Sequence, residues 1–197
     1  MKFPIFPLNG AVLFPNTNLP LNIFEERYID MVDYALSNNR LIGMIQTQLN
    51  KEFFKIGCLG KITNFTEAQD GTYQINLEGI ERFKINKMVK DDYQFIIADG
   101  EKVKYHKNFN SDSISIGKKI LLSFKNYLSA KNIKFNTSEF ENLDALNLAK
   151  LICVISPLDY LTKQMLLEFN TSGDFCKNLI SVLEIEINSS QNSSKIN

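Results

Sequence analysis

The sequence has no surplus of charge of either sign. Lysine plus arginine and aspartate plus glutamate each number 22 in a chain of 197 residues, so the formal net charge is zero. Nucleic acids and anionic membranes attract proteins chiefly through a surplus of positive charge. The balance therefore removes the strongest sequence-level argument for either partner, although it leaves room for a local basic patch.

Cysteine is also scarce. The three cysteines, Cys58, Cys153 and Cys176, are widely spaced, and no Cys-x-x-Cys pair occurs. An odd count at such spacing disfavours a disulfide framework and a zinc site, and it fits a reducing compartment. The sequence predicts neither a metal site nor a cofactor.

Long hydrophobic runs are absent. The longest apolar stretch, Leu151–Ile155, is far shorter than the roughly 18–20 residues that cross a bilayer. The segment Met1–Pro7 is too short and too interrupted by proline to be a signal peptide. We therefore expect a cytoplasmic protein without a membrane partner.

The composition that remains is that of an ordinary globular protein. Hydrophobic residues make up 44% and charged residues 22%, which excludes a wholly disordered chain. The length of 197 residues predicts one domain or a small two-lobed one, with a sizeable core.

The first hundred residues are predicted to be mainly strands. Apolar and polar residues alternate from Tyr73 to Leu77, as in a half-buried strand, and Asp70-Gly71 supplies the positive φ of a hairpin turn before it. Proline flanks Phe3–Pro7, which predicts an edge strand. Further strands are expected at Ala11–Phe14, Leu19–Ile23, Leu41–Gln46, Gly57–Phe65, Phe83–Ile85 and Phe95–Ala98.

Helical periodicity marks one early segment and most of the second half. Tyr28, Val32 and Ala35 form a stripe in the first half, and helices are expected from Ser113 onward. Ser156-Pro157 is predicted to end one helix and begin the next, and Thr171 to cap the last. We predict an α+β fold with a β-rich lobe at 1–100, a connector at 101–112, a helical lobe at 113–187 and a disordered tail at 188–197.

Several blocks occur in an order and spacing that resemble a known family. The blocks are Pro7-Leu8, Val12-Leu13-Phe14-Pro15, Leu19–Tyr28, Gly57, Asp70-Gly71-Thr72 and Leu77–Phe83. From Phe3 to Ile187 the chain resembles the N-terminal, substrate-binding domain of the ATP-dependent protease Lon, and it is most similar to the short stand-alone bacterial form. The resemblance implies a PUA-like β-barrel that contains one inserted helix and is followed by a helical bundle.

Parts of the full protease have no counterpart in the sequence. Full Lon proteases append an ATPase module and a serine–lysine peptidase domain, but Gly117-Lys118-Lys119 lacks the upstream glycine and the hydroxyl of a phosphate-binding loop. The chain ends before a protease domain begins. The resemblance therefore implies a recognition module that is not an enzyme. Asn16 and Glu26 depart from the family pattern, as does the absence of an arginine near Cys176.

Three short matches to other motifs are assigned structural roles. His106, the only histidine, has lysines beside it and no nucleophile signature. Ser115–Lys118 matches Ser-x-x-Lys without a following Lys-Thr-Gly, and Gly57–Gly60 matches the Gly-x-x-Gly loop of KH domains but opens a strand. We predict no catalytic residue, and a hydrolase that uses His106 and Ser115 is kept as a minor alternative.

The residues of the family blocks are also expected to be structural. Two of the three arginines, Arg27 and Arg82, fall within them. This placement indicates that the fold requires a guanidinium at these positions, a planar group with five hydrogen-bond donors. The full set is Pro15, Pro20, Glu25, Arg27, Tyr28, Gly71, Gly79 and Arg82.

Phenylalanine and tyrosine are abundant and supply a candidate binding surface. There are 15 phenylalanines and 7 tyrosines. An exposed cluster of such rings is typical of a protein-binding surface. The candidates near turns or strand ends are Phe14, Phe24, Phe53, Phe54 and Phe65, with Phe53-Phe54 preferred because they lie in a polar loop.

These observations lead to a binding function. The first hypothesis is a module that holds apolar segments of unfolded or damaged proteins in a groove between the two lobes, by strand-edge pairing and hydrophobic contact, as an adaptor for a protease or chaperone. The alternative is an RNA-binding protein, since PUA-like barrels include RNA readers, and the charge balance disfavours it. The oligomeric state stays open, a homo-oligomer included.

Overall fold

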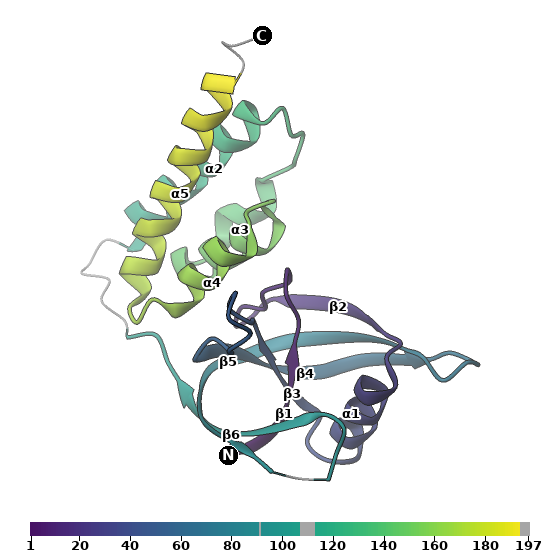
Figure 1. The fold of residues 1–197 in the computed structure, drawn as a ribbon. Helices are drawn as coiled ribbons and strands as arrows, with labels where there is room; N and C mark the ends of the chain where they lie inside the picture. The colour runs from purple at the N-terminus through teal and green to yellow at the C-terminus, as the bar shows by residue number, and fades with distance from the viewer. Residues whose placement is uncertain (91, 107–112, 194–197) are drawn as a thin grey trace. The chain divides into compact units, whose positions relative to one another are not determined.

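The computed structural model describes residues 1–90, 92–106 and 113–193 (Figure 1). They divide into two compact units. The β unit comprises Met1–Lys104 and Leu158–Leu167, and the helical unit comprises Tyr105–Pro157 and the chain from Glu168 onward. The predicted boundaries differ in one element, because Leu158–Leu167 is grouped with the strands instead of with the other late helices.

The β unit contains a mixed six-stranded sheet. Strand order is β2-β5-β4-β3-β1-β6, and β6 also pairs with β5. Among the described strand pairs, β1–β3 is parallel and the other five are antiparallel. The strands are β1 (Lys2–Pro7), β2 (Asn18–Ile23), β3 (Leu41–Ile45), β4 (Ile56–Glu67), β5 (Tyr73–Val89) and β6 (Ile96–Val103).

Two strand predictions are wrong. β1 is not an edge strand, because Ile5–Pro7 pairs with β3 and Lys2–Ile5 pairs with β6. Ala11–Phe14 forms no strand, although Val12, Leu13 and Phe14 are buried. An apolar run therefore signalled burial correctly in both places but could not specify the strand's neighbours.

The predicted hairpin at Asp70-Gly71 is confirmed. Gly71 has a φ of +80°, and the Asp70 carboxylate accepts hydrogen bonds from the backbone N–H and hydroxyl of Thr72. These bonds hold the pKa of Asp70 below its ordinary value. The turn joins β4 to β5, whose pairing begins at Glu67 and Tyr73.

The strand after this turn is longer than expected. β5 continues through Gly79 instead of stopping there, and the register shift opposite Leu59 and Gly60 absorbs one extra residue. A Cβ on Gly79 would lie 2.0 Å from the carbonyl oxygen of Phe14, so no larger residue fits. Connector residues 101–103 likewise belong to β6, and the predicted connector residues 107–112 lie outside the described residues.

The predicted early helix is α1 (Glu26–Ser37). Tyr28, Met31, Val32 and Ala35 are its buried residues, at the spacing of one helical face. They join a core cluster with apolar residues of the strands, such as Leu77. The stripe thus covers the sheet, as its periodicity indicates.

A late helix, α4 (Tyr160–Glu168), anchors to the β unit through buried polar groups. Arg82 of β5 is 1% exposed, and its Nη1 donates to the carbonyl oxygen of Leu167 at 2.9 Å. Gln164 is equally buried, and its Nε2 donates to the carbonyl oxygen of Ile56 at 2.9 Å. The helix begins at Tyr160 and not at Pro157 as predicted, because Asp159 caps it by accepting from the Thr162 N–H.

The helical unit contains α2, α3 and α5, which pack against one another. Ser156 is the C-cap of α3, as predicted, and the Thr171 hydroxyl accepts from the Asp174 N–H at the start of α5. The predicted tail is helical as far as Ser193, and residues 194–197 lie outside the described ones. The elements are α2 (Ser113–Ala130), the 3-10 helix η1 (Ser138–Asn142), α3 (Ala145–Ile155) and α5 (Ser172–Ser193).

None of the helices in the described part of the chain combines the length and apolar character that crossing a bilayer requires.

Candidate functional site

The five candidate aromatic residues differ widely in exposure. Phe14 is fully buried, so it cannot contribute to a surface, and the prediction for it is wrong because its ring belongs to the core. Phe53 and Phe54 are half-buried. Phe24 is 73% exposed and Phe65 is 45% exposed, which leaves these two as the open rings of the set.

Phe24 and Phe65 lie near the same strand ends of the β unit. Ile23, which precedes Phe24, pairs with Tyr73, and the Tyr73 and Phe65 rings have centroids 6.3 Å apart. The Arg40 guanidinium lies 6.0 Å from the centroid of the Phe65 ring. Phe53 packs instead against a separate core cluster that contains Phe83.

An exposed side chain that sequence reasoning missed lies just before Phe53. Leu49 is 92% exposed. Its loop is tied by a bridge between Thr47 and Phe53 and by the backbone bond from Gln48 N–H to the carbonyl of Glu52. The available signal was a single apolar residue inside the polar run from Gln46 to Glu52.

The two prolines of the family blocks differ in exposure. Pro15 is buried, and Pro20 is exposed on β2, which has one described strand neighbour. Proline on an edge strand discourages pairing with another chain. This proline weighs against β2 as the place for the predicted strand-edge pairing, which was not assigned to a particular strand.

Glu25, Arg27 and Tyr28 form a local group at the start of α1. Arg27 Nη2 lies 2.8 Å from Glu25 Oε2, and its guanidinium lies 4.5 Å from the centroid of the Tyr28 ring. Burial raises the pKa of Tyr28, whose ring also packs against that of Phe6. The exposed ion pair contributes little stability, at most about 1 kcal/mol.

The residues of the hydrolase alternative lie in the helical unit. The His106 backbone bridges to Thr171, and His106 N–H donates to the carbonyl of Asn170. None of the described hydrogen bonds joins the His106 side chain to Ser115. Burial raises the pKa of the Cys176 thiol to about 12, so this thiol is not an activated nucleophile.

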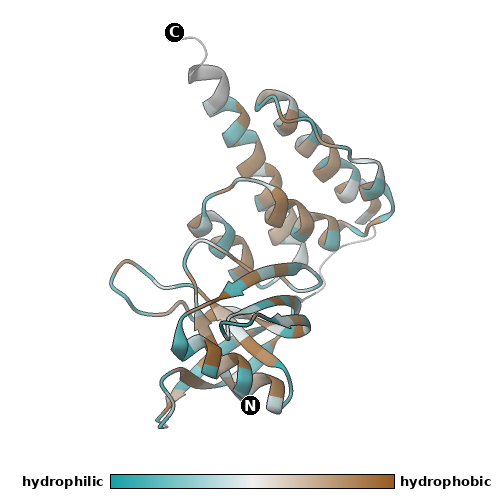
Figure 2. Cartoon of the chain, turned by 90° about the vertical axis from the view of Figure 1, so that its right-hand side faces the viewer, coloured by the Kyte–Doolittle hydropathy of each residue, from teal (hydrophilic) through white to brown (hydrophobic). Residues whose placement is uncertain are grey.

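An apolar cavity lies within the helical unit, between the first half of α2 and the start of α3. Its volume is about 660 Å³. We call it the apolar groove; Ile114, Leu121, Phe140, Leu143 and Leu148 supply its apolar lining. Ile114 is 75% exposed, and Leu143 is 38% exposed. Figure 2 shows hydrophobic and hydrophilic residues alternating along the helices of this unit.

The groove also has polar groups in its lining. Lys118 and Glu141 lie among its lining residues. The Asp144 carboxylate also lines it, but this group is engaged as the N-cap of α3, where it accepts from the backbone N–H groups of Leu146 and Asn147. A lining that combines apolar and polar side chains is typical of protein-binding surfaces.

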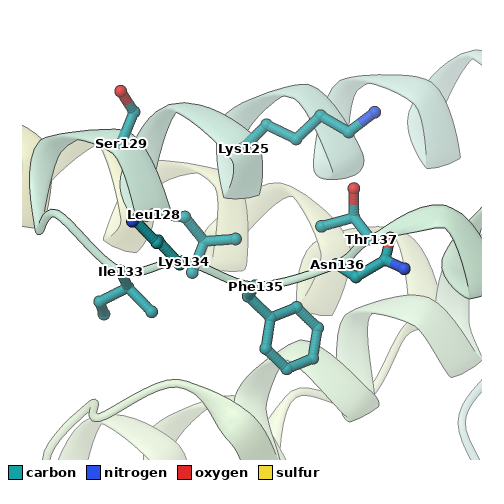
Figure 3. A pocket seen from close by; sticks show the side chains of 8 residues that line it. All are labelled: Lys125, Leu128, Ser129, Ile133, Lys134, Phe135, Asn136 and Thr137. Carbon is teal, nitrogen blue, oxygen red and sulfur yellow. The ribbon is translucent and has the colours of Figure 1, made fainter.

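The helical unit contains a second cavity. It lies beside the end of α2 and the loop that follows, where Phe135 and Ile133 accompany Lys125 and Lys134 (Figure 3). Its volume is about 640 Å³. The Phe135 ring packs edge-on against Phe124 and lies near Phe140. Part of the ring therefore packs in the core of the unit and is not available to a ligand.

Comparison with known proteins identifies the family. The family model described as the ATP-dependent protease La (LON) substrate-binding domain matches residues 2–184. The chain belongs to this family. The matched model covers the substrate-binding domain and not the catalytic domains of these proteases, and it confirms the resemblance found in the sequence.

Individual relatives agree with this assignment. The chain is 26% identical to a Lon protease of Buchnera aphidicola subsp. Acyrthosiphon pisum over 202 residues, covering 95% of this chain and 25% of the relative. It is 27% identical to a Lon protease of Cytophaga hutchinsonii, covering 93% of this chain and 24% of the relative. The chain thus spans about a quarter of the length of these curated relatives.

Solved structures share the fold of the Lon substrate-binding domain. The N-terminal domain of Mycobacterium avium complex Lon protease aligns with a TM-score of 0.75 at 16% identity, over 93% of this chain and 98% of that one. A Lon N-terminal domain protein from Xanthomonas campestris aligns with a TM-score of 0.66 at 18% identity, over 92% of this chain and 98% of that one. The α+β class is therefore confirmed.

Proposed function

We propose that this Lon substrate-binding domain is a non-catalytic module that binds apolar segments of unfolded or damaged proteins. The observation that carries the proposal is the apolar groove of the helical unit in a chain of this family. Ile114 and Leu143 are large apolar side chains that stay exposed there. Contact of apolar side chains with water is unfavourable in free energy, and this cost is removed when a partner covers the surface.

The chemistry of an unfolded chain suits this groove. Unfolded segments offer apolar side chains that a folded protein has buried, and the groove offers aliphatic and aromatic groups without a demand for one sequence. Phe24, Leu49 and Phe65 of the β unit add exposed apolar side chains of the same kind. We infer that such a module delivers its client to a protease or chaperone as an adaptor.

The ring of strand pairings in the β unit supports the predicted PUA-like barrel, and the mutual packing of α2, α3 and α5 supports the predicted bundle. The net charge of zero does not favour the RNA-binding alternative. Retention of RNA on a filter that falls steeply with salt would revive that alternative.

The test measures binding to reduced, carboxymethylated α-lactalbumin and to the native form of the same protein. We expect binding of the unfolded form only, and the double variant Ile114→Ser/Leu143→Ser should weaken it about tenfold because two apolar contacts are lost.

Leu122→Ser is the matched control for this test. Leu122 is 61% exposed on the same helix but does not line the groove, so its loss should leave the affinity within about twofold. If the wild-type chain binds neither form of lactalbumin, or if Leu122→Ser weakens binding as much as the double variant, the proposal is wrong.

A further inference from the structure

A cavity within the β unit combines aromatic rings with carboxylates. It lies beside the second half of α1 and the segment just before β6, and its volume is about 840 Å³. We call it the acidic–aromatic groove. Its lining includes Asp30, Asp33, Tyr34, Asp92, Tyr93 and Phe95.

The three rings form one contiguous aromatic cluster. Tyr93 and Phe95 stack with centroids 4.8 Å apart, and Tyr34 meets Tyr93 edge-on at 5.1 Å. Phe95 is buried and supports the cluster from below, whereas Tyr93 is 47% exposed. The face of an exposed aromatic ring carries negative potential and attracts cations.

The carboxylates on α1 are arranged at a cost to the helix. Asp30 and Asp33 are exposed and stand one turn apart, where like charges repel. The last turn of the helix carries no basic residue that could offset this repulsion.

The described part of the chain does not compensate this charge. Among its ion pairs, neither Asp30 nor Asp33 has a lysine or arginine partner. Asp33 Oδ1 accepts a hydrogen bond from the Tyr73 hydroxyl at 2.8 Å, which fixes the orientation of the carboxylate. No lysine or arginine is among the described residues that line the groove. The arrangement is therefore complementary to a cation from outside.

We propose that the acidic–aromatic groove binds an arginine side chain of a polypeptide. A guanidinium is planar and weakly hydrated, so it stacks on an exposed ring and donates at the same time to a carboxylate in its plane. A metal ion does not suit the groove, because no group of three or more His, Cys, Asp or Glu in the described part of the chain could hold one. The polypeptide source of the arginine rests on the proposed function.

The consequence is a second determinant of substrate choice. The apolar groove binds hydrophobic segments, and the acidic–aromatic groove adds a preference for an arginine in the same unfolded protein. Unfolded chains that carry arginine would then be retained longer than neutral ones.

The test uses the full chain and the capped peptide Gly-Ser-Gly-Arg-Gly-Ser-Gly, with a matched peptide that carries citrulline in place of arginine. Citrulline keeps the shape of the side chain and removes its charge. We expect the arginine peptide to bind at least about fivefold more tightly, with amide shifts in the NMR spectrum concentrated at residues 30–34 and 92–95. The variants Asp30→Asn and Tyr93→Leu should each reduce this preference, and the pair should abolish it.

Glu26→Gln is the matched control, because Glu26 is an exposed acid on the same helix and does not line the groove. Preservation of the dispersed amide spectrum shows that each variant is folded. Equal binding of the two peptides, or an equal loss in Glu26→Gln, would overturn the proposal. Tighter binding of spermidine with the same shifts would also overturn it, since the site would then be one for a small polyamine.

The two proposals fail in different ways. A chain that binds unfolded lactalbumin but shows no arginine preference contradicts only the acidic–aromatic groove. A chain that binds the arginine peptide at this groove but ignores unfolded lactalbumin contradicts the proposed function and retains the cation site.

Discussion

The two units of this protein use different physical means to specify a fold. The β unit depends on pairings between residues distant in sequence, such as Lys2 with Asp99, and on positions where two backbones nearly touch. The helical unit depends on local turns, caps and apolar stripes. Tight long-range packing leaves little room for substitution, whereas helices that pack along one face leave apolar side chains such as Ile114 exposed.

The comparison teaches where binding surfaces arise. In the β unit, the sheet and α1 bury most of their apolar residues in a common core, and what remains at the acidic–aromatic groove is charged and aromatic. In the helical unit, α2 buries Ile120 and Phe124 on one side and exposes Ile114 and Leu122 elsewhere. The two grooves therefore differ in character, because the groove of the helical unit is lined mainly by apolar side chains and the groove of the β unit by carboxylates and aromatic rings.

The largest expected effect tests the intolerance of the β unit. Gly79→Ala should destabilise the protein by about 3 kcal/mol, because the new Cβ would lie 2.0 Å from the Phe14 carbonyl oxygen and the backbone must move. The measurement is urea unfolding followed by circular dichroism.

The control for this change lies in the helical unit. A Cβ on Gly117 would meet Ala145 at 3.8 Å, an ordinary contact, so Gly117→Ala should stabilise the protein by about 0.5–1 kcal/mol. Equal effects of the two substitutions would break the contrast between the units.

A smaller effect is expected for the buried link between β5 and α4. Arg82→Met should cost about 2 kcal/mol, because the carbonyl oxygen of Leu167 loses a charged donor in a buried place. Amide hydrogen exchange should accelerate in α4, while α3 of the helical unit keeps its protection. Acceleration in α3 alone would show that Arg82 does not act on α4.

The effect that is smallest at neutral pH comes from two groups with raised pKa values, because both groups are neutral there and the difference emerges only at alkaline pH. The hydrogen bond to Asp33, followed by burial, raises the pKa of Tyr73 to about 12 from an ordinary value of 10.0. Folding therefore favours the neutral phenol, and this contribution to stability is complete below pH 10 and is lost as the pH rises toward 12.

Cys176 provides the corresponding group in the helical unit. Burial raises its pKa to about 12 from an ordinary value of 9.0, so its contribution begins to fall at a lower pH. In urea unfolding at a series of pH values, Tyr73→Phe should reduce the loss of stability above pH 10, and Cys176→Ala should reduce the loss above pH 9. Identical pH profiles for both variants and the wild type would contradict these shifts.

Local signals predicted many of the elements of both units. Asp70-Gly71 marked its hairpin, the stripe of Tyr28 and Val32 marked α1, and Thr171 marked the start of α5. Each of these depends on residues a few positions apart, whose chemistry the sequence displays directly.

Predictions that depend on distant partners were less successful. Phe14 lies near a predicted turn, like Phe24, yet one is buried and the other is exposed because of what the rest of the chain places over them. The acidic–aromatic groove joins α1 to residues about sixty positions later, and no local pattern connects Asp33 with Tyr93. Leu49 was overlooked because a single leucine in a polar run gives no periodic signal.

The sequence by itself determined the family, the α+β class and most helices and strands, because motif order, periodicity and turn chemistry are properties of neighbouring residues. Only the tertiary structure decided that β1 lies inside the sheet, that α4 belongs with the strands through Arg82 and Gln164, and which aromatic rings face water. Those outcomes depend on which side chains, distant in sequence, pack together and exclude water. No short segment of the chain contains both partners, so the free energy of their packing cannot be inferred from local sequence.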